Sequence, residues 1–223
     1  MKLYTHPISP LGRPVMMFIA DNNISVEEVE VDLFSGAQYK PEFIAINPNS
    51  AVPVLEDGDF RLSESSAILK YLADKIGSAT YPTDLKSRAK INSAMDWFNT
   101  GFYNGFGHQL CYQQLIPQLQ IADEAARHIV IARGKTMAEK YLSVLNDHMI
   151  GANNYVCGPN VTIADYLGSG IATLGDVTGC NFAQWPNVQR WITTMKARPN
   201  WASANVGLQG WIDMARGPTY VIV

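Results

Sequence analysis

The sequence lacks long apolar runs and a strong excess of charge of either sign. None of its 223 residues belongs to an uninterrupted apolar run of about 18 residues, so no membrane span is expected. The net charge is only −3, from 17 basic and 20 acidic side chains. A nucleic-acid binder needs a basic stripe, so no nucleic-acid partner is expected.

Cysteine is also scarce. The three cysteines, Cys111, Cys157 and Cys180, are an odd number and show neither a CxxC motif nor zinc-ligand spacing. The N-terminus has no apolar core of the kind found in signal peptides. These features predict a cytoplasmic protein with reduced thiols, no bound metal and no catalytic cysteine.

Residues 1–77 predict a small α/β domain. Short apolar strands and helical segments alternate in the order β-α-β-α-β-β-α. Asp57-Gly58 indicates a tight hairpin turn between the last two strands. The expected strands are residues 2–5, 25–32, 54–55 and 60–62, and the expected helices are residues 9–22, 40–46 and 65–76.

The rest of the chain predicts an all-α domain. Residues 78–84 are rich in turn-forming residues and indicate a linker, and residues 85–223 show helical periodicity without a strand signal. Thr162 and Asp165 have the spacing of a capping box, whose simplest role is to start a helix. The expected helices are residues 85–108, 120–148, 162–174 and 188–195.

The chain carries an ordered set of motifs: Asn47-Pro48, Val52-Pro53, Glu64-Ser65, Thr162 to Asp165, Pro186 to Trp191 and Arg198-Pro199. Taken together, these motifs resemble those of the glutathione transferases. The resemblance covers nearly the whole chain and implies a thioredoxin-like N-terminal domain, a helical C-terminal domain and a homodimer. Ser9 and Arg13 keep the spacing of the serine-type delta and theta classes, although Pro10 comes one position earlier than usual.

The resemblance implies that Ser9 stabilises the thiolate of glutathione. Lowering a thiol pKa by about two units requires about 2.7 kcal/mol. A hydroxyl donating to an anion contributes about 1.5 to 3 kcal/mol, and a helix N-terminus adds about 0.3 to 1 kcal/mol. From the residues alone, the favoured role of Ser9 is only that of an N-cap of the helix that follows, and it is the resemblance that favours the catalytic role. Tyr4 is the main alternative thiol activator, and His6 is a candidate for the rim of the pocket; both rank below Ser9.

Glutathione itself would be bound by the stretch from residue 38 to residue 65. The resemblance implies a cis peptide bond at Val52-Pro53, whose backbone pairs with the cysteinyl part of the tripeptide. Glu64 and Ser65, at a helix start, would bind the γ-glutamyl amine and carboxylate. The candidates for the glycyl carboxylate are Gln38, Lys40, Asn49 and Ser50.

The second substrate would lie against the aromatic-rich stretch from residue 97 to residue 112. Phe102, Phe106 and Gln109 share one helical face and are expected to line an apolar pocket with Leu11. The alternative is an ordinary aromatic core stripe. Three glycines in this stretch would leave space or permit a kink.

The expected function is therefore conjugation of glutathione, as co-substrate, to a small apolar electrophile. One alternative is a glutathione-dependent peroxidase or reductase, although thiol transfer requires a cysteine near Ser9. The other is a non-catalytic protein that binds glutathione or a hydrophobic ligand, although the candidate residues Ser9, Glu64 and Ser65 are all present.

Overall fold

The N-terminal part of the chain is built on a four-stranded sheet. The computed structural model describes residues 1–223 and orders the strands β2-β1-β3-β4, with β1 parallel to β2 and the other pairs antiparallel. Leu3 and Leu55 pair across the middle of the sheet and are fully buried. The strands are β1 (Lys2–Thr5), β2 (Glu27–Glu30), β3 (Val54–Asp57) and β4 (Phe60–Ser63).

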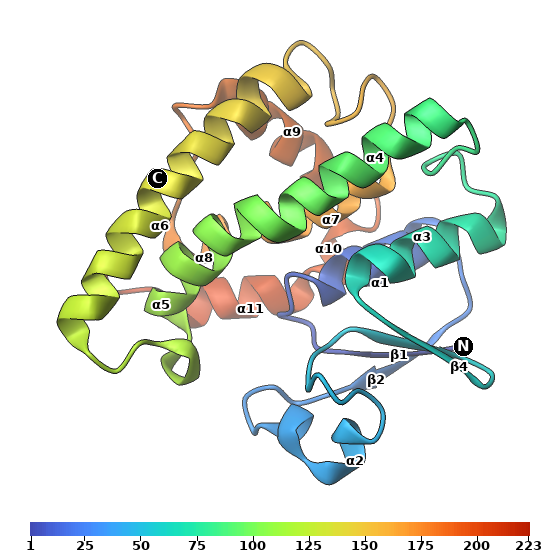
Figure 1. The fold of residues 1–223 in the computed structure, drawn as a ribbon, viewed down its shortest axis with the longest axis horizontal. Helices are drawn as coiled ribbons and strands as arrows, with labels where there is room; N and C mark the ends of the chain where they lie inside the picture. The colour runs from blue at the N-terminus through green and yellow to red at the C-terminus, as the bar shows by residue number, and fades with distance from the viewer.

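Helices cover both faces of this sheet. Figure 1 shows α1 (Gly12–Asp21) and α3 (Ser65–Ile76) between the sheet and the helices of the second half, and α2 (Pro41–Ile44) on the other side. A short 3₁₀ segment, η1 (Ala37–Tyr39), precedes α2. The predicted element order and the thioredoxin-like α/β class of this domain are confirmed.

Helix α1 begins later than predicted. The sequence predicts a helix from Ser9, whereas regular helical structure begins at Gly12. The Arg13 N–H does donate to the Ser9 carbonyl at 2.9 Å, but Pro14 has no N–H to donate to the carbonyl of Pro10, so the helical hydrogen-bond ladder is interrupted after its first bond. Ser9 nevertheless caps this end, because its Oγ accepts a hydrogen bond from the Gly12 N–H at 3.0 Å.

The second half of the chain is all-helical, as predicted. The helices predicted over residues 85–108 and 120–148 each change from α-helical to π-helical hydrogen bonding toward their C-terminal ends. The first of them continues to Leu115 rather than ending near residue 108. The last helices were not predicted, because Gly207 and Gly210 weaken their periodicity. The elements are α4 (Leu85–Trp97), η2 (π-helical, Phe98–Cys111), α5 (Tyr112–Leu115), η3 (3₁₀, Pro117–Leu119), α6 (Glu124–Val144), η4 (π-helical, Leu145–Ile150), α7 (Ile163–Ala172), α8 (Leu174–Thr178), α9 (Pro186–Lys196), α10 (Trp201–Ala204) and α11 (Val206–Met214).

Helix α7 is the centre of the core, and all of its residues are buried. The predicted capping box is present, with the Thr162 N–H and Oγ1 donating to Asp165 Oδ2 at 2.8 and 2.9 Å. Asp165 Oδ1 accepts from the Val156 N–H at 2.8 Å and from Trp191 Nε1 at 3.0 Å. One carboxylate thus joins the loop before α7 to α9. Burial raises the pKa of Asp165, and the hydrogen bonds partly offset this effect.

Two sets of polar contacts join α1 to the second half of the chain, one buried at Arg13 and one half-buried at Asp21. The Arg13 guanidinium is 1% exposed and donates to Thr173 Oγ1, Asn205 Oδ1 and the Gly170 carbonyl at 3.1, 2.6 and 2.9 Å. Asp21 pairs with Arg198 at 2.7 Å. The two halves of the chain are therefore packed together by polar as well as apolar contacts.

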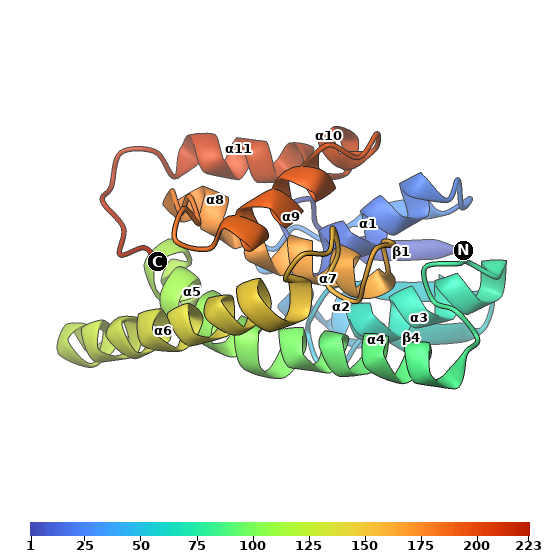
Figure 2. The ribbon, with the colours of Figure 1, turned by 90° about the horizontal axis from the view of Figure 1, so that it is seen from above.

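The C-terminal segment closes the structure. In Figure 2 the chain leaves α11 at the left of the view and curves round that edge of the molecule to end beside α5. There the Gln114 side chain exchanges two hydrogen bonds with the backbone of Val221, at 2.8 and 3.0 Å. None of the helices combines the length and the apolar character that crossing a membrane requires.

Candidate active site

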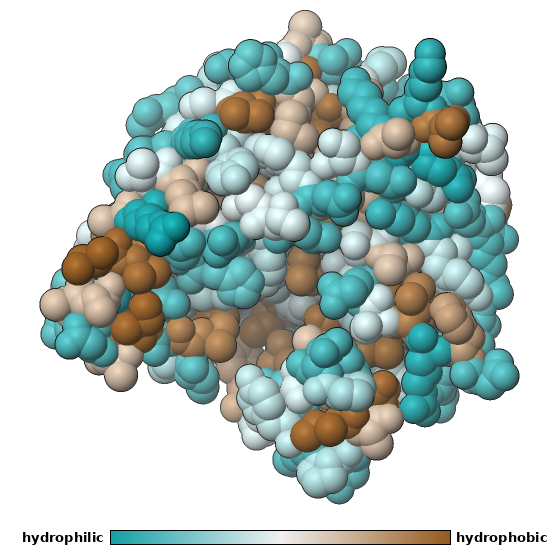
Figure 3. Space-filling view, in the orientation of Figure 1, coloured by the Kyte–Doolittle hydropathy of each residue, from teal (hydrophilic) through white to brown (hydrophobic).

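A cleft lies between the N-terminal domain and the helices of the second half. Figure 3 shows the surface hollowed between the lobe that carries α2 and the helices above it, with hydrophobic residues inside the hollow. The inner cavity has a volume of about 340 Å³, within the range of small-molecule sites. Its lining comes from five parts of the sequence: Ile8 to Leu11, Leu33 and Gln38, Ser50 to Val52, the segment with Tyr103, His108, Tyr112, Ile116 and Leu119, and Trp211 of α11.

An outer chamber of about 610 Å³ adjoins this cavity. It is mainly apolar and lies between the loop that follows β2 and the turn that follows α5. The cleft therefore combines a narrow inner part beside Ser9 with a wider apolar part. The two parts share six residues: Ile8, Leu33, Gln38, Ile116, Leu119 and Trp211.

Ser9 lies in the inner cavity with a free hydroxyl proton. Its Oγ accepts from the Gly12 N–H, and the hydroxyl donates to no group of the protein. The Ser9 carbonyl accepts from the N–H groups of Gly12 and Arg13 at 3.1 and 2.9 Å, which fixes the residue at the helix start. A Cβ on Gly12 would collide with Thr5 Oγ1, so only glycine permits this turn. Ser9 can thus cap α1 and still donate to an anion.

Val52 presents unpaired backbone groups to the same cavity. The Val52-Pro53 bond is cis, as the sequence analysis expects, and neither the N–H nor the carbonyl of Val52 has a hydrogen-bond partner in the protein. The antiparallel register pairs Val54 with Ser63. Continued by two residues, this register brings Val52-Pro53 opposite Glu64-Ser65. The residues predicted to bind the cysteinyl and the γ-glutamyl parts of glutathione are therefore neighbours.

Glu64 and Ser65 form the N-terminus of α3, although neither lines the inner cavity. Glu64 has a φ of 69°, which a non-glycine residue seldom adopts and which often marks a functional site. Its side chain is exposed and makes no ion pair, whereas Ser65 is buried. The first N–H groups of α3 have no acceptor in the protein, as expected for an anion-binding helix start.

The four candidates for the glycyl carboxylate do not lie together. Gln38 and Ser50 line the inner cavity, and Gln38 Oε1 is buried without a partner. Ser50 has a φ of 53° in a turn held by Asn47, whose side chain accepts from the Asn49 N–H and donates to the Ala51 carbonyl. Asn49 is exposed on this turn and lines neither part of the cleft.

The fourth candidate, Lys40, lies elsewhere. It lines a different cavity together with Tyr4, and that cavity shares no residue with the cleft. The structure therefore separates both Lys40 and the alternative thiol activator Tyr4 from Ser9. His6 is buried behind the Ser9 loop, where its Nδ1 accepts from the Ile8 N–H at 3.3 Å and its carbonyl from the Ser9 N–H at 2.9 Å. It positions the loop and does not line the cavity.

The expected wall of the second-substrate pocket is corrected by the structure. Leu11 lines the cavity, but Phe102 and Phe106 are fully buried and stack on one another at 5.1 Å in the core. Gln109 packs against Gly134 of α6. Helical periodicity did group Phe102, Phe106 and Gln109 on one face, but that face is turned toward the other helices.

Three side chains of the same stretch line the cavity instead. The Tyr103 and Tyr112 hydroxyls are 2.6 Å apart, and the ring of His108 lies 4.5 Å from that of Tyr103. The sequence analysis did not select them. Residues 103 and 108 are five apart, and a π-helical segment brings such residues together where an α-helix does not. The three glycines and the clustered aromatic residues of this stretch were the sequence signal that could have indicated an irregular helix here.

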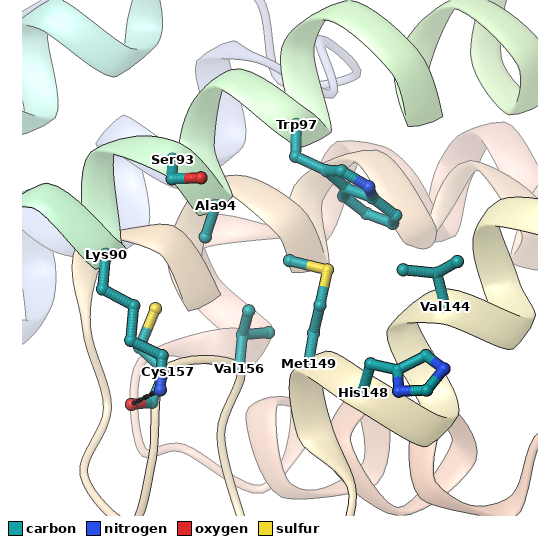
Figure 4. A pocket seen from close by; sticks show the side chains of 9 residues that line it. All are labelled: Lys90, Ser93, Ala94, Trp97, Val144, His148, Met149, Val156 and Cys157. Carbon is teal, nitrogen blue, oxygen red and sulfur yellow. Dashed lines mark hydrogen bonds between the residues drawn. The ribbon is translucent and has the colours of Figure 1, made fainter.

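A smaller cavity of about 240 Å³ lies away from the cleft. Figure 4 shows Trp97 of α4 and Met149 of η4 projecting into it, and Lys90 reaching toward Cys157, whose carbonyl accepts from Lys90 Nζ at 3.2 Å. It shares no residue with either part of the cleft. No group of three or more histidine, cysteine, aspartate or glutamate side chains is arranged to hold a metal ion.

Comparison with known proteins gives a single family. Residues 1–74 match the model of the glutathione S-transferase N-terminal domain, and residues 116–199 that of the C-terminal domain. Human glutathione S-transferase theta-2B is 34% identical over 171 residues, which are 75% of this chain and 68% of that protein. Glutathione S-transferase D7 of Drosophila melanogaster is 28% identical over 94% of this chain and 90% of its own length.

Solved structures of the same family superpose on nearly the whole chain. Human glutathione transferase theta-2, in complex with glutathione and an unknown ligand, has a TM-score of 0.85 at 28% identity and covers 98% of this chain and 92% of its own. A delta-class enzyme of Nilaparvata lugens has a TM-score of 0.82 at 29% identity, with coverages of 96% and 98%. The matched domains, relatives and fold agree, and the chain belongs to the glutathione S-transferase family.

Proposed function

We propose that this transferase conjugates the thiolate of glutathione to a small apolar electrophile, with Ser9 as the catalytic residue. The observation that carries the proposal is the free hydroxyl proton of Ser9, which lies in the same cavity as the unpaired backbone groups of Val52. A sulfur bound at Val52 would receive the hydrogen bond of Ser9 at the start of α1. Both the donor and the helix end favour the thiolate.

The tripeptide would lie along the open end of the β3–β4 hairpin. Val52 and Pro53 hold the cysteinyl part, and the α3 N-terminus with Glu64 and Ser65 holds the γ-glutamyl end. Gln38 and Ser50 face the glycyl carboxylate, with Asn49 beside them. These donors are uncharged, so they bind that carboxylate less strongly than a cation would. Lys40 is left out of this proposed set because it lines a different cavity.

Glu64→Gln is expected to weaken glutathione binding about 10-fold or more. A hydrogen bond to a charged group contributes about 1.5 to 3 kcal/mol, and the glutamine keeps the shape but loses the charge that faces the γ-glutamyl amine. Isothermal titration calorimetry with glutathione measures the change. The matched control is Glu28→Gln on β2, also an exposed glutamate but remote from the cleft. Equal affinities for the two variants would contradict the role of Glu64.

We further propose a homodimer formed through the side that carries β4, α3 and the start of α4. Figures 1 and 2 both place these elements together at one edge of the molecule. Phe60, Ile76 and Leu85 are exposed there at 45, 41 and 80%. Apolar side chains gathered at one edge are typical of an interface.

Light scattering of the purified protein should therefore give twice the chain mass of 24.6 kDa. The double variant Phe60→Glu and Leu85→Glu should shift the mass toward that of one chain, because the glutamates would lie in an apolar interface. Ile129→Glu is the control, since Ile129 is 70% exposed on α6, outside this edge. A wild-type mass of one chain would reject the dimer.

The cysteines support a cytoplasmic location and a conjugating rather than a thiol-transferring reaction. All three are free, and burial raises the pKa of each thiol. None lines the cleft, so the enzyme has no thiol there to form a mixed disulfide with glutathione. Detoxification of reactive apolar compounds is the role that fits such a site.

A further inference from the structure

His6 and Ser9 are the first and last residues of the tight turn that leads from β1 to the start of α1. The His6 carbonyl accepts from the Ser9 N–H at 2.9 Å, and Pro7 occupies the second position of the turn, which proline favours. The imidazole folds back onto the same turn, where its Nδ1 accepts from the Ile8 N–H at 3.3 Å. The backbone and the side chain of His6 therefore hold both of the residues that lead into α1.

The other side of the turn is closed by α11. Gly207 of α11 approaches Pro7 so closely that a Cβ on this glycine would collide with the side chain and the carbonyl group of Pro7. His6 itself is 6% exposed and packs edge-on against Phe34, with ring centres 5.5 Å apart. The turn is thus fixed between the imidazole and α11, and the position of Ser9 depends on both contacts.

The contact with Ile8 requires one protonation state of His6. Nδ1 can accept a hydrogen bond only while it carries no proton, so the neutral ring has its proton on Nε2, which faces Glu30 Oε1 at 3.8 Å. A second proton would go to Nδ1 and oppose the Ile8 N–H, because both groups would then be donors. The Ile8 N–H has no other acceptor in the protein. Protonation of His6 would therefore remove a contact that nothing else in the turn replaces.

The surroundings of His6 place this proton uptake below neutral pH. Burial lowers the pKa of His6 below its ordinary value of 6.5, although the negative charges of Glu30 and Asp32 act in the opposite direction. These two carboxylates, on β2 and in the loop after it, are the charged groups that face the imidazole. Helix α11 meets the turn through Gly207, which has no side chain. His6 is thus neutral at neutral pH and takes up its proton only as the pH falls below 6.5.

We propose that neutral His6 is the positioning residue of Ser9, and that protonation of His6 turns the Ser9 hydroxyl away from the sulfur of bound glutathione. This inference rests on the proposed role of Ser9 in conjugation. His6 does not line the cavity, so it acts on the thiol only through the turn. Conjugation should then weaken in acid by more than the titration of the thiol explains. A net hydrogen bond of this kind is worth about a factor of five in an equilibrium, which sets the scale of the effect.

The test compares kcat/KM for conjugation of glutathione to dinitrochlorobenzene in the wild type and in His6→Asn, at pH 7.5 and at pH 5. Asparagine can accept from the N–H two residues later, as Asn47 accepts from the Asn49 N–H at 3.1 Å, but it does not titrate. The bound thiol titrates in both proteins, so the ratio of their kcat/KM values cancels its contribution. We expect the variant to match the wild type at pH 7.5 and to exceed it about 5-fold at pH 5. The control is His128→Asn on the exposed face of α6, which should follow the wild type at both pH values.

His6→Leu separates positioning of Ser9 from a general loss of structure. Leucine fills the site but cannot accept from the Ile8 N–H, so kcat/KM at pH 7.5 should fall about 5-fold, mainly through kcat, and the pKa of the bound thiol should rise. In a Ser9→Ala background the same substitution should have no further effect, because no hydroxyl is left to position. A distorted cleft would instead lower the activity by the same factor in both backgrounds.

The outcomes separate this inference from the function on which it rests. Parallel pH profiles for the wild type and His6→Asn would overturn the role of His6, and so would a His6→Leu effect of equal size with and without the Ser9 hydroxyl. In both cases the proposed conjugation would stand. If Ser9→Ala leaves the pKa of the bound thiol unchanged, the proposed role of Ser9 is wrong and the role of His6 fails with it. Melting temperatures measured at both pH values establish that each variant is folded.

Discussion

Ser9→Ala is expected to lower kcat/KM for conjugation about 100-fold at neutral pH. The Ser9 hydroxyl has a free proton at the start of α1, and its loss removes the one side-chain donor proposed for the thiolate. A pKa difference of two units corresponds to about 2.7 kcal/mol. The bound thiol should then titrate close to its free value, about 8.5 or above. Ultraviolet difference spectra of the glutathione complex against pH measure this pKa directly.

The pH profile distinguishes this chemical role from a structural one. Ser9 also caps α1, and removing a cap costs about 1 kcal/mol, which is a melting shift of about 2 to 4 °C. Ser9→Thr keeps both the cap and the donor and should retain the low thiol pKa. An alanine variant whose bound thiol titrates like that of the parent would contradict the assignment, whatever its stability.

Asp165→Ala is expected to have the largest effect on stability. It leaves four buried donors without an acceptor: the N–H of Val156, the N–H and hydroxyl of Thr162, and the indole N–H of Trp191. Each unsatisfied buried donor costs about 1 kcal/mol or more, so the loss is about 4 kcal/mol or more. Thermal unfolding followed by circular dichroism should show a decrease in Tm of about 8 to 16 °C.

Asp123→Ala provides the matched control for this variant. Asp123 caps α6 through a single hydrogen bond to the Ala126 N–H, and the site is exposed. Its loss should cost about 1 kcal/mol, as is typical of an N-cap. If the two variants melted at the same temperature, Asp165 would be an ordinary cap and not the junction of loop, helix α7 and helix α9. Asp165→Asn should fall between them, since the amide keeps one acceptor.

The sheet and most of the long helices could be predicted from local signals. Alternating apolar residues, the Asp57-Gly58 turn and Gly77 after α3 each act within a few residues of the chain. Gly77 has a φ of 64°, the left-handed conformation in which glycine commonly ends a helix. The cis bond and the positions of Val52, Glu64 and Ser65 depended on the family resemblance, since local physics permits other roles for them.

The wall of the cleft could not be predicted by the same means. Phe102 and Phe106 are as apolar as pocket residues, and only packing against other helices decides that they are buried. The π-helical hydrogen bonding of η2 changes which residues share a face, so Tyr103 and His108 meet where an α-helical pattern separates them. Trp211 joins the cleft from α11, through contacts with residues far away in sequence.

The buried Arg13 constrains the order in which the parts of the enzyme can fold during synthesis. Arg13 lies one helical turn after Ser9, yet its acceptors are on Gly170, Thr173 and Asn205. During synthesis the N-terminal domain leaves the ribosome first. At that stage its guanidinium has no acceptors, and hiding it from water would be costly. The Arg13 guanidinium must therefore stay hydrated until α7 and the last helices have been synthesised, so the corner that contains Ser9 acquires its final surroundings only when synthesis is nearly complete.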